Sequence, residues 1–272
     1  MTRLTNPIRW TSLALTGAAI GLGTATIAET GDGVGADTTL WLAQAEGGEG
    51  GEGGEGGEGG VAPAANADAA YLAALGFVEG HLTSGLRLYA DGNVDLAETH
   101  MKHPGDEIYT DLAPALEERG KDGFEAELGA LADTVLSNGS VEDAQAAFTA
   151  LIDATTEAAA IDPSPRVQFD ALVQMTRTAA AEYAIGVIDG EIANLHEYQD
   201  AWGFLEVAKG RATALAASGD PAVAAAAQTV LAALAETEGA FDGIVPEGTV
   251  PGGADYLHGA AARIELAALS LP

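Results

Sequence analysis

The chain has 272 residues, no cysteine and a formal net charge of −30 at pH 7. So strong a negative charge repels nucleic acid and anionic lipid head groups, and it attracts cations and basic partners. An acidic surface is also typical of proteins that work in salty surroundings, so the charge alone assigns no function. The absence of cysteine excludes disulfides, thiol nucleophiles and thiolate metal sites.

The first 45 residues have the pattern of a secretory signal and leader. Arg3 and Arg9 come first, the run from Trp10 to Ala28 lacks charged residues, and the chain turns polar at Glu29. We expect cleavage near residue 28 or near residue 45, and a periplasmic or secreted product. The uncharged run is rich in Gly, Ala and Thr, so no stable membrane insertion is expected after the signal is removed.

A low-complexity segment follows the leader. Residues 46–60 are five copies of Glu-Gly-Gly, which cannot bury apolar surface or offset the entropy cost of ordering their glycines. We therefore expect residues 46–66 to be a flexible, disordered Gly/Glu linker. Residues 67–272 are long enough to form a single all-helical domain.

The spacing of apolar residues is helical from Asp68 onward. The first predicted helix reaches Tyr89 and is apolar over a wide arc, which predicts a central position. The second should end at His103, because Pro104 disfavours helical geometry in the residue before it. Pro114 is expected to kink or break the third helix.

Capping signals mark the starts of later helices. Asp122 with Glu125, and Ser140 with Asp143, resemble capping pairs, while Ser164 followed by Pro165 predicts an N-cap and a first helical position. The longest pattern begins at Phe169, and we expect it to continue past Asp189-Gly190 toward Leu205 with a kink at Gly190. Two Ala-rich helices follow. The predicted fold class is all-α, as a multi-helix bundle or irregular helical array of about eight helices.

Three of the five histidines lie close together in the sequence, at His81, His100 and His103. Histidine is a common ligand of transition metals and titrates near neutral pH, so this local excess suggests a metal or proton role. His100 and His103 share one helix face, and Glu107 follows four positions later. The alternative is that Glu107 only favours the positive end of the next helix.

A second cluster contains Asp189, His196 and Asp200, which would share one face of a continuous helix. It could complete a site begun by His81 or His100 on a facing helix, or it could be a surface pair between His196 and Asp200. Imidazole and carboxylate ligands suit zinc, copper or iron, and Met101 beside the first cluster favours copper.

In its export signal, helical pattern and His/Glu content, the chain resembles the imelysin-like periplasmic proteins. Their His-x-x-Glu motif is absent, since Glu107 lies four positions after His103, so the sequence is not assigned to that family. No nucleophile elbow, phosphate loop or dinucleotide fingerprint is present, which favours a role that is not enzymatic.

Two functions therefore stay open. The first is periplasmic handling of a transition metal, with the candidate ligands His81, His100, His103, Glu107, His196 and Asp200. The second is a protein-interaction or scaffold module without metal, because the segment from Gly85 to Pro104 resembles one tetratricopeptide-type helical hairpin. The expected partner is accordingly a metal ion or a protein, and the oligomeric state is left open.

Overall fold

The part of the chain that the structure describes is mainly helical. A computed structural model describes residues 66–272, except for the side chains of Asp106 and Glu107. The predicted signal and most of the predicted linker lie outside this range. Within residues 66–272 there are nine α-helices and one small antiparallel hairpin. The predicted all-α fold class is confirmed.

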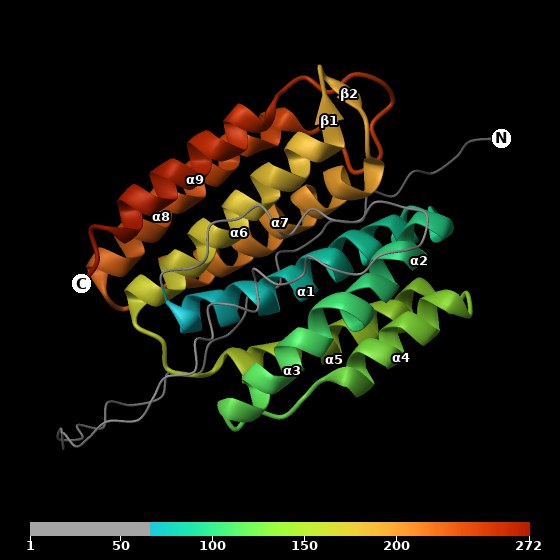
Figure 1. Cartoon of the computed structure of the whole chain (residues 1–272), viewed down its shortest axis with the longest axis horizontal. Helices are drawn as coiled ribbons and strands as arrows, with labels where there is room; N and C mark the ends of the chain where they lie inside the picture. The colour runs from blue at the N-terminus through green and yellow to red at the C-terminus, as the bar shows by residue number, and fades with distance from the viewer. Residues whose placement is uncertain (1–65) are drawn as a thin grey trace. The chain divides into compact units, whose positions relative to one another are not determined.

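The first group of helices is built around α1 (Ala67–Ala90). It is followed by α2 (Val94–His103), a π-helical turn η3 (Pro104–Ile108), α3 (Tyr109–Glu118), α4 (Glu125–Leu136) and α5 (Val141–Ala159). Helices α2 and α5 both pack on α1, and α4 packs on both of them. The four helices α1, α2, α4 and α5 therefore enclose one part of the core (Figure 1).

The second group is a closed four-helix bundle. It contains α6 (Pro165–Gly186), the strands β1 (Val187–Ile188) and β2 (Glu191–Ile192), α7 (Leu195–Ala216), α8 (Pro221–Thr237), a 3-10 turn η4 (Glu238–Ala240) and α9 (Ala254–Ala268). Helix α6 packs on α7 and α9, and α8 packs on the same two helices. Helix α1 lies against α6 and α7, so it joins the two groups (Figure 1).

Helix α1 has the central position that its apolar pattern predicts. From Ala69 to Tyr89 every residue except Thr83 and Arg87 is buried, because neighbouring helices cover it on several sides. Such a helix places any polar side chain that it carries inside the protein, where that side chain requires a partner. His81 is the imidazole on this helix, and it is 2% exposed.

The predicted continuous helix across Gly190 is wrong. Helix α6 ends at Gly186, and the chain reverses through the β1-β2 hairpin before α7 begins. Asp189 and Gly190 have φ angles of 53° and 80°, which is the left-handed pair that a two-residue hairpin turn requires. The reversal lays α7 back along α6 and takes Asp189 off the helix that carries His196.

Two predicted helix boundaries also differ from the structure. Helix α3 continues through Pro114, because the carbonyl that loses its partner belongs to the exposed Thr110 and can bond to water. Helix α4 begins after Phe124, which provides no side-chain cap, so Asp122 and Glu125 do not form the predicted capping pair. The caps at Ser140 and Ser164 are confirmed.

Two buried tyrosines hold the segment between α8 and α9 against the bundle. The Tyr183 hydroxyl donates to the carbonyl of Ala240, 2.7 Å away. The Tyr198 hydroxyl donates to the carbonyl of Gly243 at 2.8 Å and accepts from the Asp242 amide at 3.0 Å. These bonds fix the backbone that leads to Ile244, which contacts the candidate site described below.

Alkaline pH is expected to weaken the fold through its buried tyrosines. Burial is the main cause that raises the pKa of Tyr198 from 10.0 to about 12, and it raises the pKa of Tyr71 to about 12. Because these values exceed those of the unfolded chain, the stabilisation is complete below pH 10.0 and is lost as the pH rises toward 12. Denaturant unfolding across this range should show the loss. A free energy of unfolding that stays constant would contradict it.

Among residues 66–272, none of the helices combines the length and the apolar character that crossing a bilayer requires.

Candidate metal centre

Three helices bring four histidines and one aspartate together between the two groups of helices. Helix α1 supplies His81, α2 supplies His100 and His103, and α7 supplies His196 and Asp200. The rings of His100 and His196 are stacked with centroids 4.3 Å apart, and the rings of His81 and His103 are 4.7 Å apart. The two predicted clusters therefore meet in space, although about 100 residues separate them in the sequence.

The Asp200 carboxylate lies at the centre of this group. Its Oδ1 atom is 2.6 Å from Nδ1 of His81 and 3.0 Å from Nδ1 of His100. Its Oδ2 atom is 3.2 Å from Nδ1 of His196, one helical turn away. Asp200 is 2% exposed, so its charge is held inside the protein by imidazoles from three helices.

Glycines allow α2 and α7 to approach α1 closely enough for their side chains to meet. Gly80 on α1 faces Gly203 on α7, and a Cβ atom at Gly203 would lie 2.9 Å from the carbonyl carbon of Gly80 and still closer to its oxygen. Gly85 faces α2, where a Cβ atom would lie 3.1 Å from Cβ of His100. Each contact is between α1 and another helix that carries histidines of this group, so the small residues set the spacing of the group.

Gln199 determines which nitrogen of His100 carries the proton. The Gln199 side-chain amide donates from Nε2 to the backbone carbonyl of Ile244, 3.2 Å away. A carbonyl can only accept, so Oε1 of Gln199 must face the other way, where it lies 2.9 Å from Nε2 of His100. Nε2 of His100 is therefore the donor, and Nδ1 of the neutral imidazole presents a lone pair to Asp200.

In this tautomer, Nδ1 of His100 and Oδ1 of Asp200 face each other and each presents a lone pair. Nδ1 of His100 forms no hydrogen bond although it is fully buried and only 3.0 Å from Oδ1 of Asp200. A lone pair and a carboxylate oxygen at this distance repel each other unless a cation or a proton lies with them. The arrangement can therefore hold a metal ion or an additional proton.

Removing the Gln199 amide should weaken metal binding without removing a ligand. In Gln199→Leu, His100 loses the acceptor that fixes its tautomer, so we expect the affinity for Zn²⁺ to fall by about 10- to 100-fold. Competition with a chromophoric chelator measures this change. Gln228→Leu, at an exposed position on α8, is the matched control. Equal affinities in the two variants would show that Gln199 does not orient a ligand.

The charge of the surrounding imidazoles keeps Asp200 ionised. Burial on its own would raise the pKa of Asp200, but the charge of His81 and the close side-chain contacts of His100 and His81 outweigh it and hold that pKa well below its usual value. A buried carboxylate that keeps its negative charge requires a positive group beside it. A protonated imidazole or a bound cation can supply that positive charge.

The structure places the predicted ligands unequally. His81, His100, His196 and Asp200 are brought together, and the half-buried His103 lies beside them with its ring 5.6 Å from that of His196. The π-helical turn η3 begins directly after His103, and such turns occur frequently at functional sites. Glu107 belongs to this turn, but its side chain lies outside the described part of the structure.

Asp189 is a correction to the predicted second cluster, because the hairpin places it in the exposed β1-β2 turn instead of on α7. Met101 is buried on α2, where its methyl group would lie 2.8 Å from a Cβ atom at Gly85. The fifth histidine, His258, is exposed on α9. It provides a natural control for experiments on the site.

Sequence reasoning missed Glu197 as a candidate ligand. Glu197 is 5% exposed, and together with His196 and Asp200 it offers ligand atoms that lie within 4.8 Å of one another. His81, His100 and Asp200 form a second set with the same spread. The signal that could have found Glu197 is its spacing of three from Asp200, which places both carboxylates on one helix face.

The members of this group differ in their exposure. His196 has 16% of its side chain exposed, whereas His81, His100 and Asp200 are nearly inaccessible. His196 and the half-buried His103 are therefore the members of the group that lie nearest to solvent.

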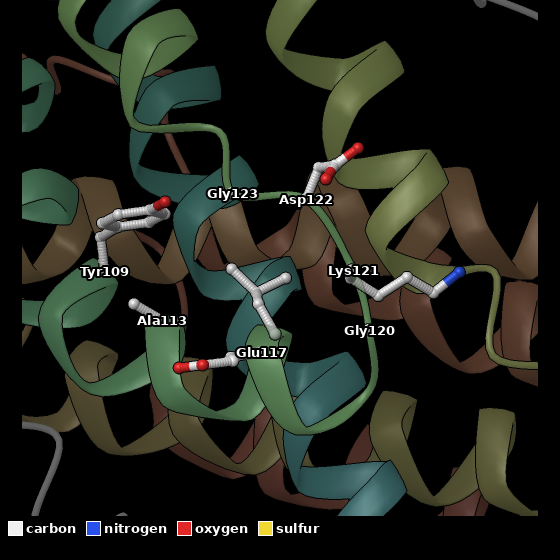
Figure 2. A pocket seen from close by; sticks show the side chains of 8 residues that line it. Tyr109, Ala113, Glu117, Gly120, Lys121, Asp122 and Gly123 are labelled. Atoms are coloured by element: carbon white, nitrogen blue, oxygen red, sulfur yellow. The ribbon is translucent and has the colours of Figure 1, made fainter.

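A surface hollow of about 390 Å³ lies elsewhere on the protein (Figure 2). It is formed by α3 and the following loop, and Tyr109, Glu117 and Lys121 are among the residues that line it. Lys121 donates from Nζ to the carbonyl of Ala160 at 2.6 Å. The hollow contains none of the clustered histidines, and we assign it no function.

Comparison with known proteins gives one partial similarity. Residues 162–267 match the family model described as the iron permease-associated 4-helix bundle domain. The match covers less than half of the chain, begins just before α6 and ends within α9, so it coincides with the second group of helices. No curated protein and no solved structure matches the chain. The matched part contains His196 and Asp200, and the similarity points to a metal-related function.

Proposed function

We propose that this protein is an exported helical protein that binds a transition metal through His81, His100, His196 and Asp200, with His103 beside them. Its role is to hold or deliver the metal rather than to catalyse a reaction. The metal is the cargo of the protein, and the ligands are imidazole nitrogens and carboxylate oxygens.

One observation carries this proposal: Nδ1 of His100 faces the Asp200 carboxylate at 3.0 Å without a hydrogen bond. Because Gln199 places a proton on Nε2, Nδ1 of the neutral imidazole and the Asp200 oxygen that faces it both offer electron pairs. A cation between or beside them relieves the repulsion and neutralises the buried carboxylate.

Iron is the preferred candidate among zinc, copper and iron. Imidazole with carboxylate is compatible with all three metals, so the ligands alone do not choose. The similarity of residues 162–267 to a domain associated with iron permeases supports iron. In the sequence, Met101 favoured copper. In the structure, Met101 is buried against Gly85 of α1.

A location outside the cytoplasm fits this role. The signal pattern in the first 45 residues supports export, and the net charge of −30 raises the local concentration of cations around the protein. A metal carrier in the periplasm would meet its cation before membrane transport. Export is tested by the size and location of the product when the full coding sequence is expressed.

Equilibrium dialysis of the full chain, without a histidine tag, tests the proposal. We expect Zn²⁺ or anaerobic Fe²⁺ to bind more tightly than micromolar, and this tight binding to be lost when His81 and His100 are both replaced by Ala. His258→Ala removes an exposed histidine from α9 and should bind as the unmodified protein does.

The acidic surface makes the control necessary, since many carboxylates bind cations weakly. Weak binding that is equal in all three proteins would assign the metal to the surface and contradict the proposal. Circular dichroism of each variant verifies that the helices are intact before the affinities are compared.

A further inference from the structure

We infer that the centre holds two metal ions, bridged by Asp200, with Glu197 as a ligand of the second ion. This inference rests on the proposed function and adds a second position to it. The first position lies among His81, His100 and Asp200, and the second among His196, Glu197 and Asp200.

The two oxygens of Asp200 face different sets of ligands. Oδ1 is directed to the Nδ1 atoms of His81 and His100, at 2.6 and 3.0 Å. Oδ2 is directed to Nδ1 of His196, at 3.2 Å. A carboxylate with different nitrogen partners on its two oxygens has the arrangement of a bridging ligand, which binds one cation through each oxygen.

The stacking of His100 on His196 makes a single shared ion unfavourable. An imidazole binds a metal in the plane of its ring, along the nitrogen lone pair. The two rings are nearly parallel, with an angle of 16° and centroids 4.3 Å apart, so an ion in the plane of one ring lies outside the plane of the other. Bridged pairs of metal ions are typically about 3.5–4 Å apart, which is comparable to this ring separation.

Charge favours the same conclusion. Glu197 and Asp200 are 5% and 2% exposed, and they occupy one face of α7 within about one turn. Two buried carboxylates so close together repel each other. Glu197 belongs to the ligand set of His196 and Asp200, and not to the set of His81, His100 and Asp200. A cation bound by both Glu197 and Asp200 reduces their repulsion.

Glu197 also has a local role at the start of α7. Asn194 caps the helix by accepting from the His196 amide at 3.1 Å, and its Nδ2 atom is 3.5 Å from Oε1 of Glu197. This is the position that a capping-box glutamate occupies. The contact is long for a hydrogen bond.

The two positions differ in chemistry. The first offers two imidazoles and one carboxylate oxygen, whereas the second offers one imidazole and two carboxylates. Oxygen-rich sites suit Mn²⁺ and iron better than copper, so the second position should accept a divalent first-row ion of this harder type. We therefore expect the two positions to fill with different affinities.

Metal stoichiometry of the full chain decides the question, with Zn²⁺ alone and Mn²⁺ alone as probes. After dialysis and removal of loosely held ions, we expect about two equivalents per chain in the unmodified protein, as for a two-metal site. Glu197→Ala should retain about half of that amount, because only the second position loses a ligand. Glu191→Ala, in the exposed β2 strand, is the matched control and should retain both ions.

The possible failures are distinct. One equivalent in the unmodified protein, unchanged in Glu197→Ala, would overturn the second position and leave the proposed function standing. No tightly held metal in the unmodified protein would overturn both. If Glu197→Ala loses its helical circular dichroism, Glu197→Gln takes its place, since it keeps the size of the side chain. The stoichiometry of the unmodified protein is decisive in every case.

Discussion

Asp200→Asn is expected to reduce the affinity for Zn²⁺ by more than about 100-fold. Replacing a residue that only orients a metal ligand costs up to about 100-fold, and the loss of a ligand should cost more. Asp200 contacts the imidazoles of His81, His100 and His196, which lie on three different helices. The asparagine is nearly the same size and can still accept hydrogen bonds, so the fold should persist. Competition with a chromophoric chelator measures the affinity.

Asp170→Asn is the matched control, because Asp170 forms a partly exposed ion pair with Arg166 on α6 at 2.8 Å. It makes the same chemical change away from the site and should leave metal affinity unaltered. Equal affinities in Asp200→Asn and the unmodified protein would remove Asp200 from the set of ligands.

Gly203→Ala should lower the free energy of unfolding by about 2 kcal/mol or more, within the range of overpacked positions. The added methyl group would contact the carbonyl oxygen of Gly80 and the hydroxyl of Ser84, and the backbone of α1 cannot move aside as a flexible side chain can. Separating α1 from α7 also moves His81 away from Asp200. We therefore expect weaker metal binding in the same variant.

Gly210→Ala is the control on the same helix. A Cβ atom at Gly210 meets nothing within 4 Å, so this change should stabilise the protein by up to about 1 kcal/mol through higher helix propensity. Denaturant unfolding of both variants measures the difference. A Gly203→Ala variant as stable as Gly210→Ala would show that the close approach of α1 and α7 is not required.

Part of the site could be predicted from local sequence patterns. The excess of histidine at His81, His100 and His103 and the helical spacing of His196 and Asp200 identify side chains that the structure brings together. The pairing of α1 with α7 could not be derived from spacing, because it depends on a long-range contact between Gly80 and Gly203. In the sequence, glycine in a helix indicates low helix propensity and room for a close neighbour, but it does not identify which helix approaches.

The errors have physical causes of the same kind. Helical periodicity on both sides of Asp189 and Gly190 hid the hairpin, although Asp-Gly after Val187 and Ile188 is a turn signal that could have been used. Gln199 matters through a tautomer, which is visible only when Ile244 and His100 are both in place. Such a three-way contact has no signature in the sequence.

X-ray absorption spectroscopy of the Zn²⁺-loaded full chain tests the central claim most directly. Coordination by His81, His100 and His196 with Asp200 predicts nitrogen and oxygen ligands at about 2.0–2.2 Å, multiple scattering from imidazole rings and no sulfur. His258→Ala should give the same spectrum. A spectrum with oxygen ligands only, and no imidazole scattering, would assign the metal to the acidic surface and contradict the account.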